Sequence, residues 1–117
     1  MNIYIIGSGT FGTAIANSLA QNQNNNVTLY SRSQKIVDDI NNNNFNTKYF
    51  PNTKLNTKIK ATNDPEMVSG YEFVFLAIPS SAIKECLNNF KYKIANEQII
   101  INISKGIFSN GQTITDY

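Results

Sequence analysis

The sequence predicts an α/β fold in which a doubly wound parallel sheet carries helices on both faces. Apolar runs typical of strands alternate along the chain with segments of helical periodicity, and this alternation indicates parallel strands joined by helices. A glycine-rich turn at residues 7–12 separates the first strand from the first helix. The 117 residues suffice for one domain with one hydrophobic core.

The N-terminal part of the chain predicts a βαβ unit. A strand is expected over residues 3–6, a helix from Thr10 to about Gln21 and a second strand over 27–30. The two strands should be parallel and their connection right-handed. The helix is predicted from Phe11, Ile15 and Leu19, which recur at every fourth position. Alanines at 14, 16 and 20 lie beside them on the same predicted buried face, and these small residues should allow close approach to the sheet.

A second helix and an aromatic segment follow. Ser33 is placed to cap a helix through 36–40, which the asparagine-rich stretch 41–46 ends. That stretch could form a recognition loop, but compositional bias is the simpler interpretation, because asparagine suits turns without specifying a ligand. Pro51 is expected to hold the aromatic pair at 49–50 in an extended conformation.

The second half of the chain predicts three more strands. A short strand is expected over 59–62, followed by a helical turn that Asp64 caps. Residues 71–78 are nearly all apolar, as expected of a parallel strand buried on both faces. A helix over 83–94 and a further buried strand over 98–102 complete the pattern.

Each glycine of the first turn has a distinct physical role. Gly7 permits a tight reversal, Gly9 lets a pyrophosphate approach the backbone, and Gly12 lets the helix press against the strand. The first amides of that helix lack intrahelical partners and can bind a phosphate. A strand before the glycines and a helix after them are the context that a Rossmann-type dinucleotide site requires. We therefore interpret residues 1–117 as a dinucleotide-binding domain, the alternative being a glycine-rich turn without a ligand.

Other polar segments are expected at the carboxyl ends of the strands, where such sheets bind ligands, namely 31–32, 79–80 and 104–106. An NAD site normally has an acidic residue about 20 positions after the glycines. Here Arg32 lies at that place, and its guanidinium can pair with a 2′-phosphate. NADP is therefore favoured over NAD, unless Arg32 is only a solvated surface residue. Lys105 is expected near the nicotinamide or a substrate phosphate, or is likewise only solvated.

Composition argues against several other functions. A formal net charge of +2 is too small to indicate nucleic acid or a membrane surface as a partner. No apolar run approaches the roughly 20 residues of a membrane span, and no basic leader precedes the first strand, so we expect a cytoplasmic protein. The sequence has no histidine, and no metal site is expected. Its single cysteine, Cys86, lies on an apolar helical stripe and is expected to pack in the core.

Five short motifs occur in a fixed order along the chain. They are Gly-Ser-Gly-Thr-Phe-Gly-Thr-Ala at 7–14, Val-Thr-Leu-Tyr-Ser-Arg at 27–32, Asn-Thr-Lys-Tyr-Phe-Pro at 46–51, Ala-Ile-Pro-Ser at 77–80 and Ser-Lys-Gly-Ile at 104–107. Their order and spacing resemble bacterial NAD(P)-dependent glycerol-3-phosphate dehydrogenase over essentially the whole chain. The resemblance implies reversible hydride transfer between NAD(P)H and dihydroxyacetone phosphate, giving sn-glycerol 3-phosphate for phospholipid synthesis.

The resemblance also implies roles for individual residues. Thr10 and Phe11 would contact the phosphates and nicotinamide side of the cofactor, and Arg32 its adenosine end. Tyr49 would close over the cofactor, while Lys105 would touch both cofactor and substrate. The expected cofactor-binding residues are therefore Gly7, Gly9, Thr10, Phe11, Gly12, Arg32, Tyr49, Pro79 and Lys105.

The chain departs from the family pattern at three places. Asn52 and Asn56 replace a glycine and a proline, and Phe108 replaces an acidic residue. The chain ends at Tyr117, whereas the family continues into a helical domain that carries its proton-transferring lysine and most substrate contacts. We therefore expect no catalytic residue within these 117 residues, weak nucleotide binding without turnover, and any homodimer to form through that domain.

Two other functions remain alternatives. A stand-alone NAD(P)-sensing module would use the same fold without catalysis, but such modules usually keep the acidic residue that Ser31–Arg32 lacks. Another two-domain dehydrogenase, such as one acting on hydroxyacyl-CoA, would share the cofactor-binding domain.

Overall fold

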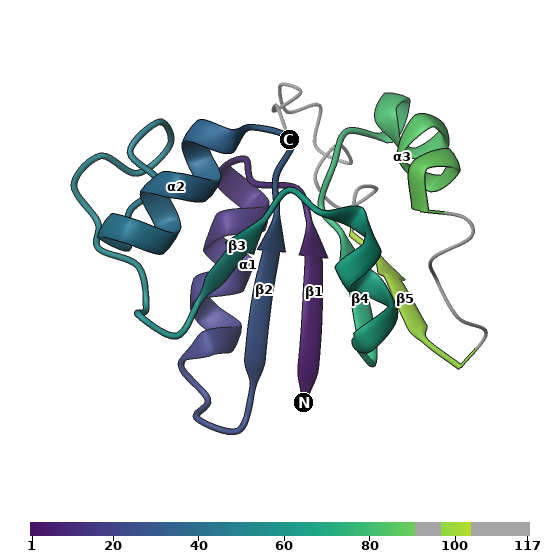
Figure 1. Ribbon diagram of the computed structural model, residues 1–117, viewed down its shortest axis with the longest axis horizontal. Helices are drawn as coiled ribbons and strands as arrows, with labels where there is room; N and C mark the ends of the chain where they lie inside the picture. Colours follow the sequence, from purple (N-terminus) through teal and green to yellow (C-terminus); the bar gives the residue numbers. More distant parts are fainter. Residues whose placement is uncertain (91–96, 104–117) are drawn as a thin grey trace.

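One parallel sheet organises the protein. Within residues 1–90 and 97–103, which the computed structural model describes, five strands lie in the order β3-β2-β1-β4-β5 (Figure 1). The predicted doubly wound α/β class is therefore confirmed. The elements are β1 (Asn2–Ile6), α1 (Thr10–Ala20), β2 (Asn26–Tyr30), α2 (Gln34–Asn43), β3 (Lys60–Thr62), the 3₁₀ helix η1 (Pro65–Gly70), β4 (Phe73–Leu76), the 3₁₀ helix η2 (Ser80–Ala82), α3 (Ile83–Phe90) and β5 (Ile99–Asn102).

The order of the strands reverses beside β1. Strands β1, β2 and β3 lead to one edge of the sheet, and the chain then crosses back so that β4 pairs with the other side of β1. Figure 1 shows the arrowheads of β1, β2 and β4 at the same edge of the sheet. The carboxyl ends of β1 and β4 flank the point of reversal, which is where open α/β sheets bind their ligands.

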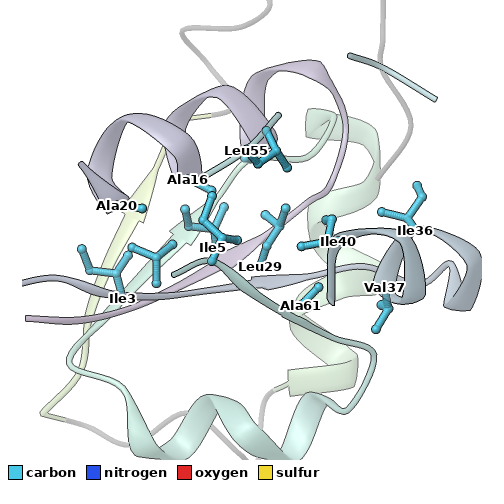
Figure 2. Packing of buried hydrophobic residues seen from close by; sticks show 13 residues of the cluster. Ile3, Ile5, Ala16, Ala20, Leu29, Ile36, Val37, Ile40, Leu55 and Ala61 are labelled. Atoms are coloured by element: carbon cyan, nitrogen blue, oxygen red, sulfur yellow. The ribbon is translucent and has the colours of Figure 1, made fainter. Parts of the chain in front are cut away.

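Helices α1 and α2 cover one face of the sheet and enclose its larger core (Figure 2). Because side chains alternate along a strand, Ile3 and Ile5 of β1 both face these helices. The buried apolar contact from α1 comes from Ala16 and Ala20, whose small side chains let the helix lie close to the sheet. The predicted buried stripe of α1 was therefore only partly right. Ile15 and Leu19 are half-buried at the flank of the core, and Phe11 is exposed.

Helix α3 and η1 cover the opposite face with a second, more aromatic core. Tyr4 and Tyr30 point to this side, and the Tyr30 and Phe90 rings meet edge to face with centroids 5.1 Å apart. The Tyr4 hydroxyl donates to the Asp64 carbonyl oxygen at 3.2 Å, and burial raises the pKa of that hydroxyl. Cys86 packs in the same core, as predicted, and burial raises the pKa of its thiol to about 11.

The predicted helix caps are confirmed. The Ser33 hydroxyl accepts a hydrogen bond from the Ile36 amide at 3.3 Å and starts α2. The Asp64 carboxylate accepts one from the Glu66 amide at 3.0 Å, although the turn that follows is a 3₁₀ helix. Helix α2 includes the first three asparagines of 41–46 and ends at Asn44, whose φ of 61° is left-handed.

The strands of the second half are less buried than predicted. Strand β4 is shorter than 71–78, and its residues Phe73 and Phe75 are only half-buried. The strand predicted over 98–102 is confirmed as β5, but its predicted burial was wrong, because Ile99 and Ile100 are 52% and 44% exposed. In the part of the chain that the structure describes, β5 pairs only with β4 and forms an edge of the sheet. The predicted helix over 83–94 is confirmed to Phe90, and residues 91–94 lie outside the described residues.

Candidate functional site

Gly7 makes the turn that follows β1. Its φ is +126°, a conformation that side-chain-bearing residues rarely adopt, and its amide donates to the Tyr30 carbonyl oxygen at 3.1 Å. A Cβ atom at this position would lie 2.3 Å from the Ala77 carbonyl oxygen. Only glycine therefore fits between the ends of β1, β2 and β4, and the predicted tight reversal is confirmed.

Gly12 brings α1 against the same turn. A Cβ atom there would lie 2.0 Å from the Gly7 carbonyl oxygen, so the close packing predicted for this glycine is also confirmed. Gly9 is the N-cap of α1, with extended backbone and no side-chain cap. The approach of a pyrophosphate to Gly9 stays a prediction.

The first turn of α1 presents backbone amides at an open surface. The first intrahelical bond runs from the Thr13 amide to the Gly9 carbonyl oxygen at 3.0 Å, so the amides of Thr10 and Phe11 precede the helical pattern. Both of these residues are exposed. The turn contains no acidic side chain that would occupy these donors. Partial positive charge at this helix end can therefore attract an anion.

Two buried serines join the ends of β1 and β2. The Ser8 hydroxyl donates to the Ser31 hydroxyl oxygen at 2.7 Å, and the same Ser31 oxygen accepts from the Ser33 amide at 3.1 Å. The Ser31 side chain is completely buried, and its hydroxyl oxygen forms hydrogen bonds within the protein. Arg32 lies next to it and is exposed at the carboxyl edge, as predicted. Its charge also acts to lower the pKa of the Cys86 thiol, although burial outweighs this effect.

Sequence reasoning missed the role of Asn46, which is completely buried. Its Nδ2 donates to the Ser8 carbonyl oxygen at 2.8 Å and to the Thr13 hydroxyl oxygen at 2.9 Å. Its backbone carbonyl oxygen accepts hydrogen bonds from the amides of Tyr49 and Phe50 at 3.1 and 2.8 Å. This residue therefore attaches the turn that carries the aromatic pair to the glycine turn. Its place in the motif at 46–51 was the only sequence signal.

Tyr49 lies in a turn, not in the extended segment predicted from Pro51, because its amide bonds back to Asn46. It is half-buried against the core under α1 and α2, and the Lys48 ammonium lies 5.3 Å from its ring centroid. Pro79 is buried at the carboxyl end of β4, where it precedes η2. Lys105 and the whole segment 104–106 lie outside the described residues, so their predicted place at this edge is untested.

A groove of about 830 Å³ lies on the side of α2. It runs between α2 and the turn after it, and its lining includes Lys35, Asp39 and Asn46. The Asp39 carboxylate accepts a hydrogen bond from the Thr47 amide at 2.9 Å, and this bond lowers the pKa of the Asp39 carboxyl. The groove is thus mixed in charge, and no residue of the glycine turn is in its lining.

Residues 1–90 and 97–103 bring together no group of three acidic, cysteine or histidine side chains able to hold a metal. No helix in those ranges has the length and apolar character to cross a membrane. The carboxyl edge offers exposed backbone amides, a guanidinium and hydroxyl groups. These groups suit the binding of a phosphate-bearing nucleotide.

Comparisons with known proteins agree with this geometry. Residues 2–117 match the family described as the NAD-dependent glycerol-3-phosphate dehydrogenase N-terminus. The chain is 44% identical over 106 residues to the glycerol-3-phosphate dehydrogenase (NAD(P)+) of Clostridium botulinum strain Eklund 17B, covering 90% of this chain and 32% of that protein. It is 40% identical over 107 residues to the enzyme of the same name from Neorickettsia sennetsu, covering 92% and 32%. The chain thus spans about a third of the length of these relatives.

Solved structures show the same arrangement. A crystal structure of glycerol-3-phosphate dehydrogenase from Coxiella burnetii matches with a TM-score of 0.79 and 29% identity, over 86% of this chain and 31% of that one. The yeast glycerol-3-phosphate dehydrogenase matches with a TM-score of 0.81 over 87% of this chain and 33% of that one, and at 22% identity it supports the fold alone. The resemblance inferred from the five motifs is confirmed. The chain belongs to the NAD-dependent glycerol-3-phosphate dehydrogenase N-terminus family.

Proposed function

We propose that this chain is the dinucleotide-binding domain of a cytoplasmic glycerol-3-phosphate dehydrogenase. The protein that contains it would transfer a hydride reversibly between NAD(P)H and dihydroxyacetone phosphate, giving sn-glycerol 3-phosphate. The observation that carries this proposal is the glycine turn, which holds an open helix N-terminus at the reversal of strand order in a chain of this family. Family membership favours this function over a stand-alone sensing module or a hydroxyacyl-CoA dehydrogenase.

The residues of the turn fit a diphosphate. Side chains are excluded at Gly7 and Gly12 by carbonyl oxygens of the protein itself. The exposed first turn of α1 would bind the diphosphate through the amides around Thr10 and Phe11. The bound nicotinamide would supply or accept the hydride, while these groups only bind and orient it.

We propose further that NADP is preferred. Residues 31–33 at the end of β2 contain no carboxylate, and the Ser31 hydroxyl is already bonded to Ser8 and Ser33. The exposed Arg32 guanidinium is therefore the group in this segment suited to a 2′-phosphate.

The remaining assignments rest on the family resemblance. Tyr49 would cover the cofactor, Pro79 would line its path at the end of β4, and Lys105 would contact cofactor and substrate. The proton-transferring lysine and the other contacts to the triose phosphate would come from the helical domain of the family, which would also supply any homodimer interface.

Arg32→Ala tests the cofactor assignment. We expect the Kd for NADPH to rise about tenfold while the Kd for NADH changes little, because only NADPH carries the 2′-phosphate. Fluorescence titration of the reduced nucleotides measures both values. Lys35→Ala removes an equal charge from an exposed position three residues further along the chain and should leave the ratio of NADPH to NADH affinity unchanged. Absence of binding of either nucleotide to the wild-type protein would refute the proposed function itself.

A further inference from the structure

Asn46 connects two parts of the molecule that lie far apart in sequence. Its side chain bonds to Ser8 in the glycine turn and to Thr13 in α1, while its backbone closes the turn that carries Tyr49. The Thr13 hydroxyl also donates to the Ser8 carbonyl oxygen, at 3.1 Å. That one carbonyl oxygen therefore accepts two hydrogen bonds from completely buried side chains.

These two bonds determine the orientation of the peptide between Ser8 and Gly9. The described residues contain no cis peptide bonds, and in a trans peptide the N–H points opposite to the C=O. With the Ser8 carbonyl held against Asn46 and Thr13, the Gly9 amide is directed away from both side chains. Gly9 is the buried N-cap of α1, so its amide directly precedes those of the first helical turn.

The side-chain oxygen of Asn46 indicates that a contribution to stability does not by itself account for an asparagine at this position. Its Oδ1 is buried and has no hydrogen-bond partner among the described residues. A buried, unpaired acceptor costs free energy. Reversing the amide would not relieve this cost, because its oxygen would then face the Ser8 carbonyl oxygen, and two acceptors repel each other.

We propose that Asn46 is a positioning residue for dinucleotide binding, which fixes the Ser8–Gly9 peptide so that the Gly9 amide is presented to the diphosphate. This inference rests on the proposed function and deepens it. Asn46 does not touch the ligand. It acts through the glycine turn, to which its side chain bonds, while its backbone carbonyl closes the turn that carries Tyr49.

The test compares ligands with and without a diphosphate. Asn46→Asp keeps the shape of the side chain but replaces the donor with an oxygen that repels the Ser8 carbonyl. We expect the affinity of the full-length gene product for ADP to fall about tenfold relative to its affinity for adenosine. In turnover assays the KM for NADPH should rise while kcat at saturation is retained. The Gly9 amide resonance should also lose most of its ADP-induced shift in NMR spectra.

Asn25→Asp is the matched control. Asn25 is buried, and its Nδ2 donates to the Leu19 carbonyl oxygen at 2.9 Å, at the opposite end of α1. This variant should lower thermal stability and leave the ratio of ADP to adenosine affinity unchanged. A structural role for Asn46 would make both variants behave alike, and that result would overturn the inference.

A second variant covers the case in which Asn46→Asp does not fold. Thr13→Val removes one of the two donors to the Ser8 carbonyl oxygen in an isosteric way. We expect a smaller fall in the same affinity ratio, and an unchanged ratio would overturn the inference. If the wild-type protein binds ADP no more tightly than adenosine, the proposed diphosphate site fails, and the inference fails with it.

Discussion

Thr10 is the residue at which the anion-binding role of α1 is tested most directly. It is exposed at the first helical position, and the first turn has no acidic side chain. Glutamate there should interact favourably with the helix N-terminus, by about 0.3–1 kcal/mol, yet repel a diphosphate. We therefore predict that Thr10→Glu retains or raises the free energy of unfolding while the Kd for NADPH increases about tenfold.

Urea unfolding and NADPH titration together check this prediction. Ser18→Glu adds the same charge at an exposed position near the other end of α1 and should leave the Kd for NADPH unchanged. Equal NADPH affinity in Thr10→Glu and the wild type would contradict diphosphate binding at this helix end.

Cys86 provides a prediction of pH dependence. Its pKa is raised by burial from about 9 to about 11, so the folded protein favours the neutral thiol. Above pH 9 the unfolded chain gains stability by ionising this thiol while the folded chain does not. The free energy of unfolding should therefore fall as the pH rises from about 9 to about 11, and alkylation by iodoacetamide at pH 8 should be slow.

The difference between the wild type and Cys86→Ala isolates this contribution from other groups that titrate in the same range, such as Tyr4. Chemical denaturation at several alkaline pH values measures it. Parallel pH profiles for the two proteins would show that the thiol does not titrate as stated.

Among the elements, α2 begins at a cap, Ser33, where substitutions should affect both the stability of the protein and its preference between NADPH and NADH. Ser33→Ala removes the acceptor for the Ile36 amide and should lower the free energy of unfolding by about 1 kcal/mol. Ser33→Asp keeps an acceptor there and should preserve stability, but its charge next to Arg32 should weaken binding of NADPH relative to NADH. Urea denaturation and nucleotide titration of both variants measure the two effects, and equal losses of stability would contradict the capping role.

The elements themselves were predictable because their signals are local. Periodicity, the caps at Ser33 and Asp64 and the glycine turn each depend on residues close together in sequence. The exposure of β5 was not predictable, since an apolar strand has the same pattern in the centre of a sheet and at its edge. In α1, Ala16 and Ala20 pack against the sheet as the sequence predicted, whereas Phe11, predicted on the same face, is exposed.

The candidate site was predictable to the same extent. Local motif spacing indicated Gly7, Gly12 and Arg32. The structure places the two glycines at the reversal of strand order and Arg32 at the carboxyl end of the adjacent β2. The Ser8–Ser31 bond and the contacts of Asn46 join segments far apart in the chain. No local pattern specifies such bonds, because they arise only when the strands and helices assemble.

For the molecule as a whole, the size of the chain relative to its relatives carries a prediction. The 106 residues aligned with the Clostridium botulinum relative cover 32% of its length, and the 117-residue sequence contains no histidine. We expect the 117-residue chain by itself to bind NADPH weakly and not to reduce dihydroxyacetone phosphate, because a proton donor and most substrate contacts would lie elsewhere. Monitoring NADPH absorbance with the purified chain tests this, and measurable turnover would refute it.

The position of β1 at the reversal of strand order also has a consequence for biosynthesis. Ile3 pairs with Val27 on one side and with Phe73 on the other. Because translation proceeds from the N-terminus, β2 emerges from the ribosome long before β4 does. One side of β1 therefore stays unpaired until the second half of the chain is synthesised. We expect chaperones to bind the nascent chain during that interval.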